Sequence, residues 1–137
     1  MNRGLLEQIH VLVVDEDQAS RAQIQRIVGD HGGVTTGVST VERALEFLVL
    51  VRPSVVICDL RSGGGKGGLW LLDQLRNGQH VTVPVIATSR HADDEGLAAT
   101  LTFNGFVAKP AEPHELCALI LGVVDPRRNV VPPSCSA

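Results

Sequence analysis

Four short runs of apolar residues constrain the fold of this chain more than any other feature of its sequence. They lie at residues 10–15, 54–59, 83–89 and 105–109, and a weaker fifth run lies at 33–39. The runs are rich in valine and isoleucine and are continuous rather than alternating, which indicates strands covered on both faces. Strands of this kind are typical of parallel sheets that lie between two layers of helices.

Helical patterns separate the runs. The first has Asp17 as its predicted N-cap and Gly32 as its predicted end, and the second has Ser39 or Thr40 as its cap. The patterns lie at residues 18–32, 39–50, 68–78, 92–101 and 112–124. The residues predicted to face the core are Ala22, Ile24, Ile27, Val28, Val41, Leu45, Leu48, Leu69, Leu72, Leu75, Leu116, Leu119, Ile120 and Val123. Because strand and helix alternate five times, the sequence predicts an α/β fold with right-handed crossovers.

The composition limits the class of protein. With 137 residues, 44% of them hydrophobic, the chain has the size and apolar content of one domain. A net charge of −3 and an aromatic content of 3% argue against a direct nucleic-acid interface. The sequence has no apolar stretch near the ~18 residues of a membrane span, and its first residues do not read as a signal peptide.

The three cysteines, Cys58, Cys117 and Cys135, lie far apart and do not form a metal-binding motif. We expect reduced thiols and therefore a cytoplasmic protein that does not interact with a membrane. The expected organisation is an N-terminal extension at 1–8, a domain at 9–124 and a flexible tail, rich in proline and serine, at 125–137.

Polar residues stand at the ends of the four strong runs. They are Asp15 and Glu16 after the first run, Asp59 after the second, Thr88 and Ser89 after the third, and Lys109 after the fourth. In an open parallel sheet, ligands bind in the crevice beyond the carboxyl ends of the strands. We therefore expect carboxylates, a hydroxyl and a lysine to converge at one edge of the sheet.

This set of side chains favours phosphoryl chemistry. Carboxylates that share a site repel one another and need a cation, and oxygen ligands favour a hard ion such as Mg²⁺. A lysine and a hydroxyl beside a metal-bound carboxylate suit a phosphoryl group with about two negative charges. An aspartate can itself attack phosphorus and form an acyl phosphate.

Four motifs make the sequence similar to a known family: VLVVDED, VVICDL, PVIATS and GFVAKP. In this order and spacing, over residues 9–124, the chain resembles the response regulator receiver domains (CheY-like domains) of two-component systems. The resemblance implies a flavodoxin-like (βα)5 doubly wound fold with a five-stranded parallel sheet in the order 2-1-3-4-5. It also implies a signalling domain rather than an enzyme. Such a domain accepts a phosphoryl group from a sensor histidine kinase or a histidine phosphotransfer protein, with Mg²⁺ or Mn²⁺, and assists its own phosphorylation and dephosphorylation.

The resemblance assigns roles to the acidic residues. Asp59 matches the phosphoacceptor, which is also a metal ligand. Asp15 and Glu16 match the acidic pair that holds the metal ion directly and through water. The backbone carbonyl of Arg61 matches the third protein ligand.

The resemblance also assigns a switch. Lys109 matches the lysine that pairs with the phosphoryl oxygens, with a cis peptide bond to Pro110, and Phe106 matches the switch aromatic. Counting from Pro84 without gaps places Ser89 at the position of the switch hydroxyl, and we favour this assignment. Thr88 is the alternative, because the small residue Ser89 follows it and because its distance to Lys109 in the sequence is closer to the family's usual value. The switch is expected to change the face made by the fourth helix, fifth strand and fifth helix. That face would also serve a homodimer or an output partner that the sequence does not identify.

The segment after Asp59 departs from the family pattern. It has five glycines between residues 63 and 68, one extra residue and no bracing proline. Because glycine loses the most entropy on ordering, we expect a mobile loop. The segment is not a nucleotide-binding P-loop, because Leu60 and Gly67 break the required spacing.

Other interpretations remain open at this point. A receiver-like domain can serve as an interaction module that is never phosphorylated. A flavin- or nucleotide-binding protein would need a phosphate-binding loop after the first strand, where the acidic DEDQAS stands. Arg61, Lys66 and Arg90 would either attract phosphate donors or hinder them. The fourth helix is expected to be short or irregular.

Overall fold

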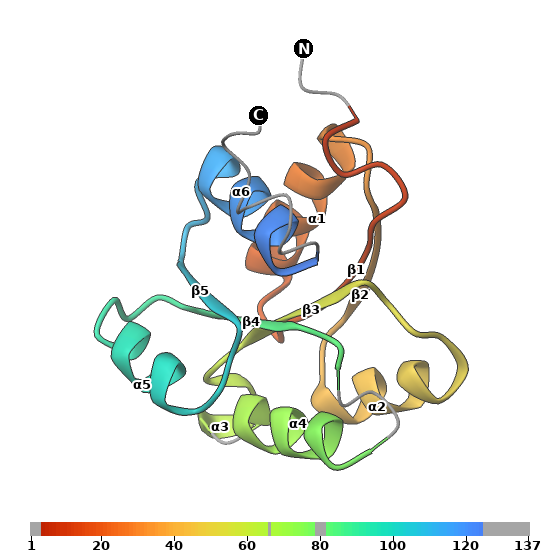
Figure 1. Cartoon of the computed structure of the whole chain (residues 1–137). Helices are drawn as coiled ribbons and strands as arrows, with labels where there is room; N and C mark the ends of the chain where they lie inside the picture. The colour runs from red at the N-terminus through yellow and green to blue at the C-terminus, as the bar shows by residue number, and fades with distance from the viewer. Residues whose placement is uncertain (1–3, 66, 79–81, 125–137) are drawn as a thin grey trace, which may run out of the picture.

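The computed structural model describes residues 4–65, 67–78 and 82–124. Its centre is a five-stranded parallel sheet in the order β2-β1-β3-β4-β5 (Figure 1). The strands are β1 (His10–Val14), β2 (Val34–Val38), β3 (Val55–Asp59), β4 (Val85–Ser89) and β5 (Gly105–Ala108). Each predicted run forms a strand, and the predicted strand order is confirmed.

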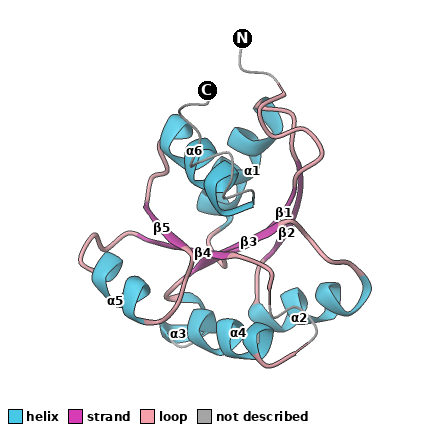
Figure 2. Cartoon of the chain, viewed as in Figure 1, coloured by secondary structure: helices cyan, strands magenta, loops and turns pink. Residues whose placement is uncertain are grey.

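Helices cover both faces of the sheet. They are α1 (Gln18–Asp30), α2 (Val41–Leu50), α3 (Ser62–Gly65), α4 (Gly67–Arg76), α5 (Asp94–Thr100) and α6 (Pro113–Val124). Helices α1 and α6 lie on one face, and the other four lie on the opposite face (Figure 2). The doubly wound architecture is therefore confirmed. Among the described residues, the helices are too short or too polar to cross a membrane.

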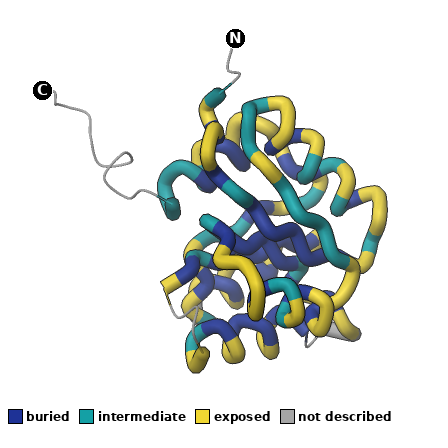
Figure 3. The backbone as a smooth tube through the Cα atoms, turned by 90° about the vertical axis from the view of Figure 1, so that its right-hand side faces the viewer, coloured by how far each residue is buried: buried dark blue, intermediate teal, exposed yellow. Residues whose placement is uncertain are grey.

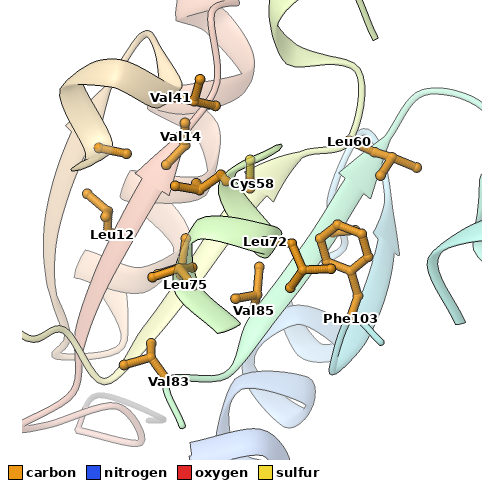
Figure 4. Packing of buried hydrophobic residues seen from close by; sticks show 14 of the residues in the cluster. Leu12, Val14, Val41, Cys58, Leu60, Leu72, Leu75, Val83, Val85 and Phe103 are labelled. Carbon is orange, nitrogen blue, oxygen red and sulfur yellow. The ribbon is translucent and has the colours of Figure 1, made fainter. Parts of the chain in front are cut away.

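The core consists of two apolar clusters, one on each face of the sheet. Leu12 and Val14 of β1 lie in the cluster that includes residues of α2 and α4 (Figure 4). Val11 and Val13 lie in the other, with residues of α1 and α6. Successive strand residues point to opposite faces, so β1 is buried on both sides. Figure 3 shows that the buried residues run through the centre of the molecule. This double burial explains why the strands appear as continuous apolar runs.

The predicted helix boundaries are confirmed where a capping side chain defines them. Asp17 caps α1, and its Oδ2 accepts a hydrogen bond from Ser20 N at 2.9 Å. Thr40, rather than Ser39, caps α2. Gly32 follows the end of α1 with a φ of 91°, a left-handed conformation that favours glycine.

The predicted inward faces are wrong at two positions. Ala22 and Leu69 are exposed. In α4 the buried stripe contains Gly68, Leu71 and Leu75, which follow the three- and four-residue spacing of a helix. The predicted Leu72 and Leu75 are buried as well, so the prediction for α4 is wrong only at Leu69, and the buried face also includes glycines.

The first described residues contribute to the core. Leu6 is fully buried in the cluster that includes α1 and α6. The amides of Gly4 and Leu6 both donate to His31 O, at 3.1 and 2.9 Å, and tie this segment to the end of α1. Residues 1–3 and 125–137 lie outside the described residues, and the flexible tail therefore stays a prediction. The proposed domain limits of 9–124 also stay a prediction.

The glycine-rich segment after Asp59 is helical, which corrects the expectation of a loop, whereas its mobility stays a prediction. It forms α3 and the start of α4, except for Lys66, which lies outside the described residues. A β-carbon at Gly67 would lie 2.6 Å from Ser62 O, and one at Gly68 would lie 3.0 Å from Asp59 O. The glycines therefore let α4 pack directly on the backbone that leaves β3. At Gly67 and Gly68 the small size of glycine matters more than its flexibility.

This packing predicts opposite effects for two glycine-to-alanine substitutions. Gly68→Ala is expected to destabilise the protein by about 1–3 kcal/mol, because the new methyl group crowds the Asp59 and Leu60 backbone. Gly96→Ala, in the interior of α5, meets nothing within 4 Å and should stabilise by about 0.5–1 kcal/mol. Urea unfolding measures both. Equal effects of the two substitutions would contradict the close packing of α4.

Candidate functional site

The carboxyl ends of four strands meet at one edge of the sheet. Leu60 N donates to Thr88 O at 2.8 Å, and Lys109 N donates to Ser89 O at 2.8 Å. These backbone hydrogen bonds extend the pairing of β3 with β4 and of β4 with β5 beyond the strand ends. The polar residues predicted to converge therefore start from neighbouring backbone positions.

Lys109 joins two carboxylates at this edge. Its Nζ lies 2.6 Å from Asp15 Oδ2 and 3.1 Å from Asp59 Oδ2. The side chains of Lys109, Asp15 and Asp59 are 4%, 1% and 15% exposed. Buried carboxylates repel each other unless a cation lies between them, and the Lys109 ammonium supplies that charge. The Lys109–Pro110 peptide bond is cis, as predicted.

The predicted acidic pair is divided between the interior and the surface. Asp15 is buried, and its Oδ1 accepts a hydrogen bond from Asp17 N at 2.9 Å. Glu16 is exposed, and its Oε2 accepts a hydrogen bond from Gly63 N at 3.2 Å. Glu16 thus contacts the segment that follows β3, and it does not join the Lys109 cluster.

Asp59 opens onto a small cavity. Its Oδ1 accepts a hydrogen bond from Arg61 N at 3.1 Å, which orients the carboxylate. The cavity has a volume of about 150 Å³ and is lined by Asp59, Arg61, Ser89, Arg90, His91 and Lys109. The Arg61, Arg90 and Lys109 side chains supply N–H donors to the cavity beside the Asp59 carboxylate.

The two candidate hydroxyls have different surroundings. Ser89 lines the cavity, and its Oγ donates to Asp94 Oδ2 at 2.6 Å and accepts from His91 N at 3.0 Å. Thr88 Oγ1 is buried and has no hydrogen-bond partner among the described residues. Thr88 does not line the cavity that contains Asp59.

Asp94 is a site residue that the sequence analysis missed. Its carboxylate accepts two hydrogen bonds from the Arg61 guanidinium, both 2.9 Å long, in addition to the one from Ser89. The Arg61 hydrogen bonds and then the Ser89 hydrogen bond lower the pKa of Asp94 to about 2. Its place five residues after a strand-end serine gave a weak signal, because an acid at a helix start is common.

Arg90 connects the cavity to the start of α1. Its Nη2 lies 2.9 Å from Asp17 Oδ2 and 3.2 Å from Ser20 Oγ, at the start of α1. The hydrogen bonds from Ser20, more than the charge of Arg90, lower the pKa of Asp17. Arg61 and Arg90 are thus each paired with an aspartate, although both line the cavity.

Phe106 and Cys58 do not line the cavity that contains Asp59. Phe106 is half-buried on β5 and lines two other cavities, one towards α5 and one towards α6. The Cys58 thiol is fully buried and donates to Asp59 O at 3.6 Å. Burial, followed by the charges of Asp59 and Asp15, raises the pKa of this thiol well above its usual value. Cys58 therefore has no thiolate character and belongs to the core.

The donor set at the strand ends fits a hard divalent cation. Asp15 and Asp59 offer only oxygen ligands, as Mg²⁺ prefers. Asp15 Oδ2 is buried and accepts no hydrogen bond from the described residues, since its contact with Lys109 Nζ is an ion pair without hydrogen-bond geometry. One ammonium does not balance two carboxylates. No three acidic, histidine or cysteine side chains in the described part of the chain form a complete metal centre on their own.

Comparisons with known proteins agree with this geometry. The model of the response regulator receiver domain matches residues 11–121. An uncharacterised 14.6 kDa protein of Leptolyngbya boryana, from the 3′ region of sodA1, is 30% identical over 84% of this chain and 89% of its own length. The DNA-binding transcriptional regulator NtrC of Escherichia coli K12 is 30% identical over 88% of this chain, which spans 24% of NtrC.

A solved structure gives the same result for the fold. The chemotaxis response regulator CheY4 of Vibrio cholerae superposes with a TM-score of 0.74 at 19% identity, over 84% of this chain and 98% of CheY4. The match of the family model to most of the chain, the strand order and the polar strand ends lead to one conclusion. The chain belongs to the response regulator receiver domains, a family of signalling domains.

Proposed function

We propose that this receiver domain accepts a phosphoryl group on Asp59 from a sensor histidine kinase or a histidine phosphotransfer protein. The observation that carries the proposal is the Lys109 ammonium, which pairs with Asp15 and Asp59 beside a cavity that Ser89 also lines. A carboxylate, an ammonium and a hydroxyl at one small cavity are the groups that phosphoryl transfer to aspartate requires.

The proposed reaction uses the carboxylate as nucleophile. An Asp59 oxygen forms a bond to phosphorus while the bond from phosphorus to the donor imidazole nitrogen breaks. The bonding electron pair stays on that nitrogen, which takes a proton from solvent. Lys109 pairs first with the carboxylate and then with a phosphoryl oxygen, and Ser89, rather than Thr88, donates a hydrogen bond to another.

Mg²⁺ or Mn²⁺ would be held by Asp15, Asp59 and the backbone carbonyl of Arg61, with Glu16 acting through water. The ion would neutralise charge on the phosphoryl oxygens. Buried Asp15 supports this assignment because its Oδ2 accepts no hydrogen bond from the described residues. Exposed Glu16 would keep its bond to Gly63 N and contact the ion only through solvent.

The proposed output is a change in the face formed by α5, β5 and α6. Phe106 lies on this face between two cavities, which gives its ring two directions in which to pack. The same face would serve a homodimer or an output partner. The domain would act in the cytoplasm as a phosphoacceptor that assists its own phosphorylation and dephosphorylation, without being an enzyme for a separate substrate. Buried, unpaired Cys58 and Cys117 are consistent with a reducing compartment.

Phosphorylation of Asp59 has a direct test. The wild-type protein, incubated with Mg²⁺ and a small phosphodonor such as acetyl phosphate, should gain one base-labile phosphoryl group by mass spectrometry. Asp59→Asn should gain none, because an amide is a poor nucleophile, whereas Asp73→Asn on the exposed side of α4 should react like the wild type. Labelling of Asp59→Asn would contradict the assignment. An unlabelled wild type would favour an interaction module that is not phosphorylated.

The metal assignment is tested separately from phosphorylation. At a tenfold excess over its Kd, Mg²⁺ should raise the Tm of the wild type by roughly 3–6 °C, because it binds only the folded state. Asp15→Asn should abolish most of this rise. Asp30→Asn, an exposed residue at the opposite end of α1, is the control with the same change of charge and should keep the rise. A rise that survives in Asp15→Asn would place the ion elsewhere.

A further inference from the structure

We propose that Asp94 is a positioning residue that holds the Ser89 hydroxyl and the Arg61 guanidinium in the unphosphorylated state, so that Ser89 must leave Asp94 to reach a phosphoryl group on Asp59. This inference rests on the proposed function. It adds a competitor for the switch hydroxyl that is built into the chain. Asp94 would set how readily the domain changes from its unphosphorylated to its phosphorylated arrangement.

The hydrogen bonds of Asp94 connect two walls of the cavity. Arg61 Nε and Nη2 donate to its two carboxylate oxygens at 2.9 Å each, and Ser89 Oγ donates to Oδ2 at 2.6 Å. Asp94 is only 5% exposed, whereas the Arg61 side chain is 53% exposed. A buried carboxylate with a paired guanidinium and a charge-assisted hydroxyl contact forms stronger hydrogen bonds than neutral groups do.

The Ser89 hydroxyl has one hydrogen, which it donates to the Asp94 carboxylate. Its oxygen meanwhile accepts a hydrogen bond from His91 N at 3.0 Å. Ser89 therefore cannot donate to a phosphoryl oxygen and to Asp94 at the same time. Binding of a phosphoryl group at Asp59 requires an exchange of one acceptor for the other.

The position of Asp94 gives this exchange a structural effect. Asp94 is the first residue of α5, and Ser89 is the last residue of β4. Arg61 belongs to the segment that leaves β3 directly after Asp59. Loss of the Ser89 bond would thus loosen the start of α5 from β4, while Arg61 still connects it to the segment beside Asp59.

The main experiment measures the affinity for beryllofluoride, a phosphoryl analogue, in the presence of Mg²⁺ by calorimetry. Asp94→Asn should bind it about tenfold more tightly than the wild type, the scale of one hydrogen bond to a charged group. Asp93→Asn removes the same charge one residue earlier, at an exposed position, and should stay within about twofold of the wild type. An affinity of Asp94→Asn that equals or falls below that of the wild type would overturn the inference.

A double-mutant cycle tests whether Asp94 acts through Ser89. In the Ser89→Ala background, Asp94→Asn should lose most of its tenfold gain, because the competing hydroxyl is absent. A gain that persists in full would overturn the exchange. The same two substitutions, compared by urea unfolding of the unphosphorylated protein, should be coupled; additive effects would show that the two side chains do not interact.

Two further outcomes separate this inference from the proposed function. If neither the wild type nor the variants bind beryllofluoride, the proposed function fails and the exchange fails with it. If all bind equally, only the role of Asp94 fails. Should Asp94→Asn not fold, the ¹³C NMR signal of the Asp94 carboxyl carbon in the wild type gives the answer. It should shift when beryllofluoride binds, and an unchanged signal would overturn the inference.

Discussion

The ion pairs of Lys109 determine the arrangement of the whole site. Asp15 follows β1 and Asp59 ends β3, and these neighbouring strands bring two nearly buried carboxylates together. Without a cation between them, the two carboxylates would repel each other and favour separation of the strand ends. The ammonium comes from the end of β5, two strands away from β3 in the sheet. The contact of a single ammonium with both carboxylates thus depends on the correct order of the strands, which links folding of the sheet to assembly of the site.

Positive charges around the cavity are each held by an acidic partner. Arg61 pairs with Asp94, Arg90 pairs with Asp17, and Lys109 is shared by Asp15 and Asp59. The two arginine pairs differ in strength. Arg90 and Asp17 are 63% and 44% exposed, so water screens their attraction. The carboxylate of Asp94 is 7% exposed and accepts three hydrogen bonds. The cavity is therefore bordered by one weak and one strong pair.

The sheet was predictable because burial on both faces leaves a direct trace in the sequence, namely continuous valine and isoleucine runs. Asp15, Asp59, Ser89 and Lys109 were predictable because parallel strands end at one edge. Asp94 was not predictable, because its hydrogen-bond partners come from two other segments and its neighbours in the sequence resemble an ordinary helix start. The close packing of the glycines after Asp59 was not predictable for a similar reason. Glycine permits both mobility and close packing, and only the neighbouring backbone of Asp59 and Leu60 decides between them.

The two sides of the site are held in different ways: one by close packing of α4 on the main chain, and the other by side-chain hydrogen bonds. Gly67 and Gly68 place the helix against the main chain of residues 59–62, so this side cannot move without separating packed backbone. The other side, from Ser89 to Asp94, is held by side-chain hydrogen bonds that can be replaced one for one. In the proposed exchange, hydrogen bonds on one side of Asp59 would change partners while the other side keeps its shape.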